Sequence, residues 1–297
     1  MVKKFNIERG SKEPWPEEYK ANREAVIREF KDLGIEIETA PELLERLIEL
    51  KEDGHFDDAV RMAQIIDIIP KLAEEDKKKL KTAALIHDIG KTGGVHEKEG
   101  DKKLEDEERK LVRAIYTYKF PWGTGAMVAN KGLELIDKKK YPQKDELLEF
   151  LKKEGIEIDE IKMSKLWREH VHDGYEILTD WRHDKITQEI INMAVSHHIV
   201  DGENPAQLTE AELAEKGVRA FSMISGYLLL TLVDKYEAFR TRGNKKHKEA
   251  IEELKKDVSH SKFLSPENKL LYLDTVDELD KLKDKLEKIV DGQARAA

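Results

Sequence analysis

The sequence predicts an all-α fold, a helical bundle that carries a helical insertion. Apolar residues recur at helical spacing along most of the 297-residue chain, and Lys and Glu interleave on the other positions, as in EEDKKKLK at 74–81. Strand signals are nearly absent, since only residues 34–39 alternate weakly between apolar and polar side chains. With 39% hydrophobic residues, the chain has enough apolar side chains for one large domain or two modest ones.

The helices can be placed in order along the chain. After a polar arm at 1–20, the pattern predicts helices at 21–33, 41–51, 55–69 and 76–89, which end near Gly34, at Pro70 and at the expected C-cap Gly90. Glycines and prolines punctuate residues 92–160, which indicates an insertion or cap. Helices resume at 163–178, 187–199, 221–239, 246–258 and 265–289. We expect an N-terminal helical extension at 1–45 and a main domain at 46–297 that contains the insertion.

Composition excludes several kinds of site. The chain has no cysteine, so a disulfide framework, a thiol nucleophile and a thiolate metal site are excluded, and any metal would use His, Asp and Glu. A net charge of -9 does not favour duplex nucleic acid as a partner. The N-terminus lacks an apolar stretch of signal-peptide length, and the most apolar stretch, 221–233, is too short to cross a bilayer. We therefore expect a cytoplasmic protein without a membrane partner.

Histidines and aspartates stand at helical positions where Leu or Ile would be expected. His87 shares its predicted face with Leu80, Ala83 and Ala84, and Asp234 lies on an otherwise leucine-rich helix. An ionisable side chain costs several kcal/mol to bury unless something compensates it. A single buried aspartate could be a structural cap, but the whole set predicts a metal centre. Its members are His55, His87, Asp88, His170, His197, His198 and Asp234.

The adjacent residues His87 and Asp88 can serve two metal ions, the histidine as a terminal ligand and the aspartate as a bridge. His197 and His198 point about 100° apart on a helix, so one can bind a metal while the other binds a second metal or packs. Two metal ions clamp a phosphate and bring the pKa of a bridging water near neutrality, so that the hydroxide can attack phosphorus. Lys91 is placed to act as a point charge for a phosphoryl oxygen, with a solvated surface lysine as the alternative.

This series of residues resembles the HD superfamily of metal-dependent phosphohydrolases, and its His-His pair is similar to that of the HD-GYP cyclic-dinucleotide phosphodiesterases. HFDDAVRMA at 55–63, EHVHDGYEIL at 169–178 and LVDKYEAF at 232–239 are similar to the family's metal-ligand helices. The resemblance implies an HD-domain helical bundle, two divalent metal ions and a nucleotide substrate. It assigns the ligand role to His170, and makes His172 a residue behind the ligands or one that contacts substrate.

The chain departs from the family pattern in three places. The segment IVDGENPAQL at 199–208 keeps the family's Asp-Gly pair but lacks its Gly-Tyr-Pro triplet, and the insertion at 92–160 is longer than is usual. Trinuclear members carry a glutamate four positions before the first histidine, where this chain has Lys51. These departures favour two metals and weaken the assignment of cyclic di-GMP as the substrate.

Basic residues that follow Asp234 form a second candidate feature. Arg240, Arg242 and Lys245 lie in a turn-like segment, and the resemblance implies phosphate-contacting basic residues there, with a solvated basic loop as the alternative. His96 and Glu97 could add a metal ligand. Trp122 could stack on a base, or anchor its loop by packing. The remaining histidines stand in polar contexts that predict surface positions: His183, His247 and His260.

The leading hypothesis is a phosphodiesterase that hydrolyses a cyclic dinucleotide or another nucleotide, with Asp88 and Lys91 in catalytic roles. Fe or Mn is the first expectation for the metals, with Ni, Co, Zn or Mg as alternatives. Two other hypotheses stay open: a mixed-valent di-iron oxygenase, which would use the same ligand set, and a non-catalytic nucleotide-binding module with a structural metal. The expected partner is a small nucleotide, and a homodimer is compatible with the sequence.

Overall fold

The computed structural model describes residues 16–94, 106–118, 120–121, 123–139, 141–153, 155–181, 183–215, 219–220 and 224–294. Within these residues the chain is predominantly helical, and the all-α prediction is confirmed. A short antiparallel pair, β1 (Arg219–Ala220) with β2 (Ile224–Ser225), was not predicted. It takes the start of the helix predicted at 221–239, so that helix begins at Gly226, where Ser225 accepts a hydrogen bond from Leu228 as its N-cap.

The N-terminal part places the first candidate ligands at helix ends. Its elements are α1 (Glu17–Asp32), η1 (Ile37–Thr39), α2 (Pro41–Glu52), α3 (His55–Asp67), α4 (Glu74–Ile86) and η2 (Ile89–Thr92). The weakly alternating segment at 34–39 contains a 3-10 turn and no strand among the described residues. Ile37, the first residue of this turn, is fully buried in the helical core. Pro41 opens α2, where its missing N–H is not needed. Val26 and Phe30 of α1 belong to the same core as α3 and α4.

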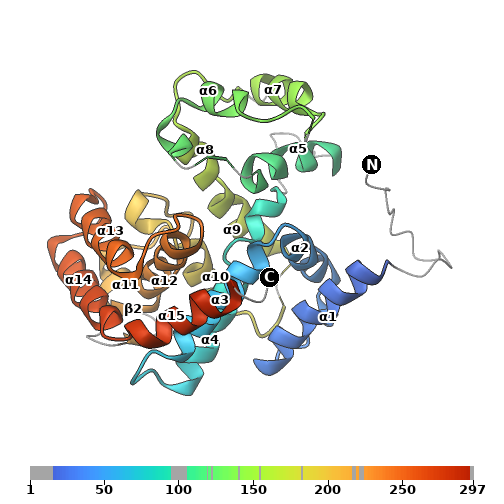
Figure 1. Ribbon diagram of the computed structural model, residues 1–297. Coiled ribbons are helices and arrows are strands. Elements are labelled where there is room, and N and C mark those ends of the chain that lie inside the picture. The colour runs from blue at the N-terminus through green and yellow to red at the C-terminus, as the bar shows by residue number, and fades with distance from the viewer. Residues whose placement is uncertain are drawn as a thin grey trace.

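The next segment forms its own group of short helices. They are α5 (Asp106–Thr117), η3 (Thr124–Ala126), α6 (Ala129–Glu134), α7 (Lys144–Lys153) and α8 (Met163–Arg168). They lie together at the top of Figure 1, above the remaining helices. Their apolar side chains make a second hydrophobic core, which contains Ile115, Leu133, Leu147 and Met163. The boundaries expected for an insertion at 92–160 and an extension at 1–45 stay predictions.

The C-terminal part completes the main core. Its helices are α9 (His170–Asp180), α10 (Gln188–Val195), η4 (Ile199–Asp201), α11 (Glu210–Glu215), α12 (Gly226–Thr241), α13 (His247–His260), α14 (Pro266–Asp280) and α15 (Lys283–Ala294). The predicted helices at 163–178 and 265–289 are each broken into two, at Glu169 and at 281–282. Helix α12 is the most enclosed, since each residue at 226–234 is buried.

Gly90 does not have the C-cap role that was expected of it. Helix α4 ends at Ile86, and Gly90 lies inside η2, where its lack of a side chain serves a different purpose. A Cβ at this position would lie 1.8 Å from the backbone oxygen of His170 and 2.5 Å from the backbone nitrogen of Gly174. The glycine therefore permits the backbones of η2 and α9 to cross in contact.

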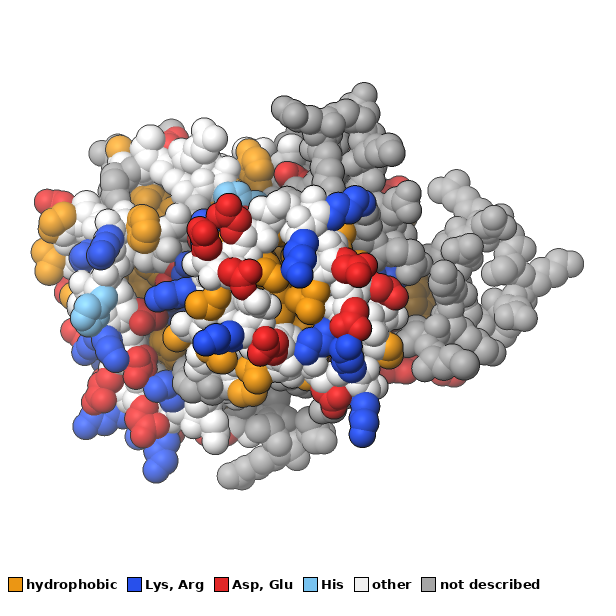
Figure 2. Space-filling view, turned by 90° about the horizontal axis from the view of Figure 1, so that it is seen from above, with side chains coloured by type: hydrophobic (Ala, Val, Ile, Leu, Met, Phe, Trp, Pro, Cys, Tyr) orange, Lys and Arg blue, Asp and Glu red, His pale blue; other side chains and the backbone are white. Residues whose placement is uncertain are grey.

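On the face that Figure 2 shows, charges of both signs lie side by side, with scattered apolar side chains between them. This distribution agrees with the interleaved Lys and Glu of the sequence. Among the described helices, none combines the length and the apolar character needed to span a membrane.

Candidate metal centre

Five segments that are far apart in the sequence bring the candidate ligands to one place. His55 begins α3, His87 and Asp88 connect α4 to η2, and His170 begins α9. His197 and His198 connect α10 to η4, and Asp234 lies within α12. Most of the ligands therefore stand at helix ends or in tight turns, where the backbone direction changes and side chains from several helices can converge.

Asp88 lies at the centre of this group and faces it with both carboxylate oxygens. Its Oδ1 lies 3.1 Å from His170 Nε2 and 3.7 Å from His197 Nε2. Its Oδ2 lies 3.4 Å from His87 Nε2 and 3.7 Å from His55 Nδ1. Because the two oxygens face two different groups of imidazoles, Asp88 has the geometry of a bridging carboxylate.

Two sets of ligand atoms are compact enough to hold a metal ion, with all atoms of a set within 4.8 Å of one another. One is His170, His197 and His198, and the other is His87, Asp88 and His197. Asp234 flanks the second set, with its Oδ1 3.6 Å from His87 Nε2. All of these side chains are buried except His198, which is partly exposed.

Backbone carbonyl groups fix the orientation of three of the histidine rings. In His87, Nδ1 lies 2.7 Å from the carbonyl oxygen of Ala84. In His170, Nδ1 lies 2.6 Å from the carbonyl oxygen of Trp167. In His197, the same distance of 2.6 Å separates Nδ1 from the carbonyl oxygen of Ala194. A carbonyl oxygen only accepts hydrogen bonds, so Nδ1 carries the proton in each ring. The lone pair of Nε2 then faces the cluster, which is the arrangement of a metal-binding histidine whose other nitrogen is held by the protein.

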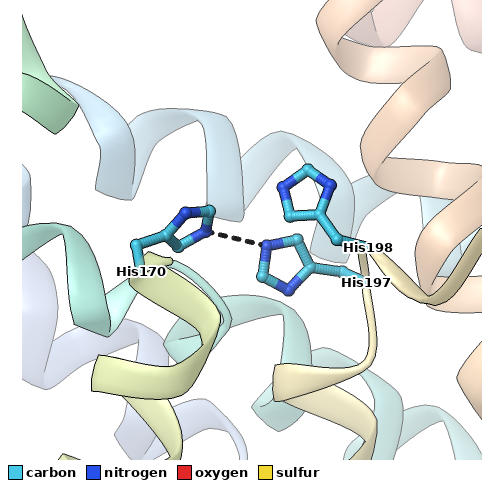
Figure 3. A group of neighbouring side chains, drawn as sticks. All are labelled: His170, His197 and His198. Carbon is cyan, nitrogen blue, oxygen red and sulfur yellow. Dashed lines mark hydrogen bonds between the residues drawn. The ribbon is translucent and has the colours of Figure 1, made fainter. Parts of the chain in front are cut away.

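The close pair formed by His170 and His197 tests whether a metal fits these residues. Their Nε2 atoms lie 3.0 Å apart and point toward each other, with His198 beside them (Figure 3). Two lone pairs at this distance repel unless a cation lies between them. Two nitrogens that are each about 2.1 Å from one metal ion lie about 3 Å apart, so a shared metal suits the pair.

His55 supplies a second indication that the site suits a cation. Its Nδ1 is buried and has no hydrogen-bond partner among the described residues. The atom faces Asp88 Oδ2 across 3.7 Å, inside the cluster. A buried nitrogen without a partner costs free energy, which a metal bond to that lone pair would recover.

Comparison with known families agrees with this geometry. The family model for the HD domain matches residues 55–154. The match spans 100 of the 297 residues, so the chain is similar to the HD domain over about a third of its length. HD domains are helical, they bind divalent metals, and their family consists largely of metal-dependent hydrolases. The matched segment includes the first histidine and the His-Asp pair, and it does not distinguish the HD-GYP branch from the rest of the family. No curated protein and no solved structure matches the chain.

The electrostatics of the candidate ligand cluster favour neutral imidazoles and ionised carboxylates, which are the forms that bind metals. Burial lowers the pKa of His170 and, together with neighbouring charges, lowers those of His55 and His197 strongly. Burial also acts on Asp88, but His87 and Lys91 outweigh it and hold the pKa of this carboxyl well below its usual range. For His87 itself, the charges of Asp88 and Asp234 outweigh burial and raise the pKa.

These shifts predict how the stability of the metal-free protein depends on pH. Because the pKa values of three buried histidines are lower in the folded chain than their ordinary value of about 6.5, the unfolded chain takes up their protons first. Their contribution to stability is complete above about pH 6.5 and is lost as the pH falls below it. His87, His172 and Glu237, whose pKa values are raised, act in the opposite sense. We expect the melting temperature of chelator-treated protein, followed by circular dichroism, to fall between about pH 7.5 and pH 5.5.

A substitution on the surface provides the control for this prediction. His260 is exposed, so His260→Ala should leave the pH dependence of the melting temperature as it is. A melting temperature that stays constant or rises toward the acidic end would contradict the assignment of neutral buried histidines.

Lys91 is buried among the candidate ligands. The alternative that the sequence left open, a solvated surface lysine, does not describe it. Only 8% of the residue is exposed, and its Nζ donates to Asp88 Oδ2 at 2.5 Å. Arg242 stands at the rim, half-exposed, with Nη2 4.0 Å from Asp234 Oδ1. Both cations are therefore close to the cluster, where an anionic ligand would meet them.

The other predicted substrate contacts lie in different places. Arg240 donates to Tyr236 and Asp291, and Lys245 pairs with Glu253, so these two basic residues are engaged away from the cluster. That Arg240 and Lys245 bind phosphate stays a prediction, and their hydrogen bonds and ion pairs in the structure do not support it.

His170 and His172 lie in different surroundings, as the resemblance implies for a candidate ligand and a residue outside the ligand set. His170 lies within the cluster, whereas His172 lies outside it with Nε2 3.5 Å from Glu203 Oε2, and this carboxylate raises its pKa. Lys51, which argued against a third metal, donates to Asp57 at 2.5 Å. The substrate role of His172 stays a prediction.

Sequence reasoning missed two neighbours of the ligands. The ring of Tyr116 in α5 lies edge-on to His170, at 5.8 Å between centroids, and its hydroxyl donates to Asp173. Asp201 faces His198, with 3.1 Å between Oδ2 and Nδ1. The Asp-Gly pair in IVDGENP was a usable signal for Asp201, but nothing in the sequence of 106–117 indicated that α5 would reach the cluster.

Two of the three histidines predicted on the surface are buried. His183 is 8% exposed, and His247 is 3% exposed and lies between Tyr236 and Asp280, whose polar atoms satisfy its ring nitrogens. The polar sequence context was misleading because the polar neighbours of a histidine can face solvent while its own side chain faces inward. The expectations for His96, Glu97 and Trp122 lie outside the described residues.

Proposed function

We propose that this protein hydrolyses a phosphodiester bond of a small nucleotide with the help of two divalent metal ions. The observation that carries the proposal is the position of Asp88, whose two oxygens face two groups of imidazoles. One ion would be held by His55, His87, Asp88 and Asp234. The other would be held by Asp88, His170, His197 and His198.

The metals would supply Lewis acidity and an activated water when bound. The chain's own residues would bind and orient the phosphate. Lys91 Nζ, fixed beside Asp88, would neutralise one phosphoryl oxygen, and the guanidinium of Arg242 at the rim would neutralise another. Because Lys91 is almost fully buried, its charge is little screened by water and acts strongly on a nearby anion.

The proposal is tested with purified protein loaded with Mn²⁺ or Fe²⁺. The expected result is metal-dependent hydrolysis of bis(p-nitrophenyl) phosphate, followed by cleavage of at least one member of a panel of cyclic dinucleotides and nucleotide esters. No hydrolysis of any ester by metal-loaded protein would contradict the proposal. Consumption of dioxygen by the iron-loaded protein, without ester hydrolysis, would favour the di-iron oxygenase instead.

Lys91→Ala is expected to lower kcat for bis(p-nitrophenyl) phosphate by about 10²- to 10³-fold, the usual cost of removing one group that stabilises transition-state charge. Metal content should be retained, since Lys91 is not a metal ligand. Lys51→Ala is the matched control, because Lys51 lies close to the site in sequence but pairs with Asp57. Equal kcat values for the Lys91 and Lys51 variants would remove Lys91 from the proposed reaction.

A further inference from the structure

A hollow of about 310 Å³ lies close to His198, outside the metal-ligand cluster. Arg168, η4 and the end of α13 form its walls, and Asp201 belongs both to this lining and to the contact with His198. One side chain therefore separates the hollow from a candidate metal ligand.

Lys235 pairs with both acidic side chains of the hollow and offsets one of their two negative charges. Lys235 Nζ donates to Asp201 at 3.1 Å and to Asp257 at 3.2 Å, and the burial of this lysine makes the contacts strong. Lys262, also in the lining, is exposed and makes no ion pair among the described residues. Arg168 Nε is buried and makes no hydrogen bond with a described residue, although Glu203 lies 3.2 Å away. Lys262 is therefore the cation of the lining that has no ion-pair partner among the described residues, whereas Arg168 lies beside Glu203.

Phe263 provides an apolar wall that remains open to solvent. The residue is 56% exposed, which is unusual for phenylalanine, and the outer edge of its ring lies over the backbone of Gly202, where a Cβ would be 2.4 Å from the ring. Ser261 holds the loop in place, because its hydroxyl donates to the carbonyl group of Val200 at 2.8 Å and accepts from the N–H of Phe263. The loop is thus held in place while more than half of the surface of Phe263 stays open to solvent.

We propose that this hollow binds the nucleoside part of a nucleotide, with the base stacked on Phe263 and the sugar-phosphate near Arg168 and Lys262. An exposed aromatic ring beside basic side chains is the combination by which proteins bind nucleotides without reading base identity. The volume is at the lower end of the range for small-molecule pockets, about 300–1,000 Å³, so the hollow takes one nucleoside unit and not a whole dinucleotide. The inference rests on the proposed function in one respect: the scissile phosphate of the same molecule would lie at the metal centre.

Calorimetry with chelator-treated protein tests the hollow separately from catalysis, because metal-free protein should cleave nothing. The probes are 5′-AMP, 5′-GMP and inorganic phosphate. The native chain should bind both nucleotides more tightly than phosphate. Phe263→Ala should raise the nucleotide Kd about tenfold, within the range found when a stacking aromatic is removed, and leave the phosphate Kd unchanged. Leu270→Ala is the matched control, since Leu270 is 63% exposed on α14 and does not line the hollow.

Equal nucleotide affinity in the native chain and the Phe263→Ala variant would overturn the inference, as would a native chain that binds phosphate as well as it binds nucleotides. Metal content of the Phe263→Ala protein should match that of the native chain, because Phe263 lies outside the cluster of candidate ligands. The native protein could hydrolyse no ester while the Phe263→Ala substitution still weakens nucleotide binding. That result would support the nucleotide site in the hollow and contradict the proposed function.

Discussion

Asp88→Ala is expected to abolish metal loading and ester hydrolysis while the helix content of the protein stays the same. The substitution removes the one carboxylate that faces both groups of imidazoles. Metal affinity should fall by more than about 100-fold, because even the loss of a group behind a ligand costs 10- to 100-fold. Elemental analysis after dialysis measures metal loading, and circular dichroism measures helix content.

Asp67→Ala is the control for this substitution. Asp67 is exposed at the end of α3 and makes a surface ion pair with Lys81, which contributes at most about 1 kcal/mol. This variant should keep its metal and its activity. A metal-loaded, active Asp88→Ala protein would contradict the bridging role of Asp88 and with it the two-metal site.

Gly90→Ala has the second-largest expected effect, although Gly90 contributes no ligand atom. The new Cβ would lie 1.8 Å from the backbone oxygen of His170, so η2 and α9 would have to move apart. Because the obstacle is backbone and not a flexible side chain, we expect a loss of stability of about 3 kcal/mol or more. Movement of α9 would also shift His170 relative to Asp88 and weaken metal binding. Denaturant unfolding and metal titration measure the two effects.

Gly292→Ala is the matched control, because nothing lies within 4 Å of a Cβ at this position in α15. Alanine is the better helix former, so this variant should be unchanged or more stable by up to about 1 kcal/mol. Native-like stability and metal affinity in Gly90→Ala would show that η2 and α9 do not depend on their close contact.

The sequence was informative about the metal centre because burying charge is costly. Ionisable residues such as His87 and Asp234 interrupt apolar helical faces, and few arrangements other than a metal site make that tolerable. The same helical periodicity predicted the fold class. The adjacency of His87 and Asp88 also indicated that the pair could serve two metal ions, with Asp88 as the bridge.

Features that depend on how helices cross were not predictable from periodicity. Gly90 was expected to end a helix, because glycine is common there, and only the three-dimensional crossing with α9 shows its actual purpose. Arg240 was grouped with Arg242 by proximity in sequence, but the two point to different neighbours, Asp291 and Asp234. The contact of Tyr116 with His170 likewise joins two segments that no sequence pattern relates.

The number of metal ions that the protein binds is the most direct test of the two-metal site. Elemental analysis of protein saturated with Mn²⁺ or Fe²⁺ and then freed of excess metal should give two ions per chain. His170→Ala should reduce this number to one, because His170 belongs to only one of the two groups of ligands. A native protein that binds one ion or none under these conditions would contradict the account.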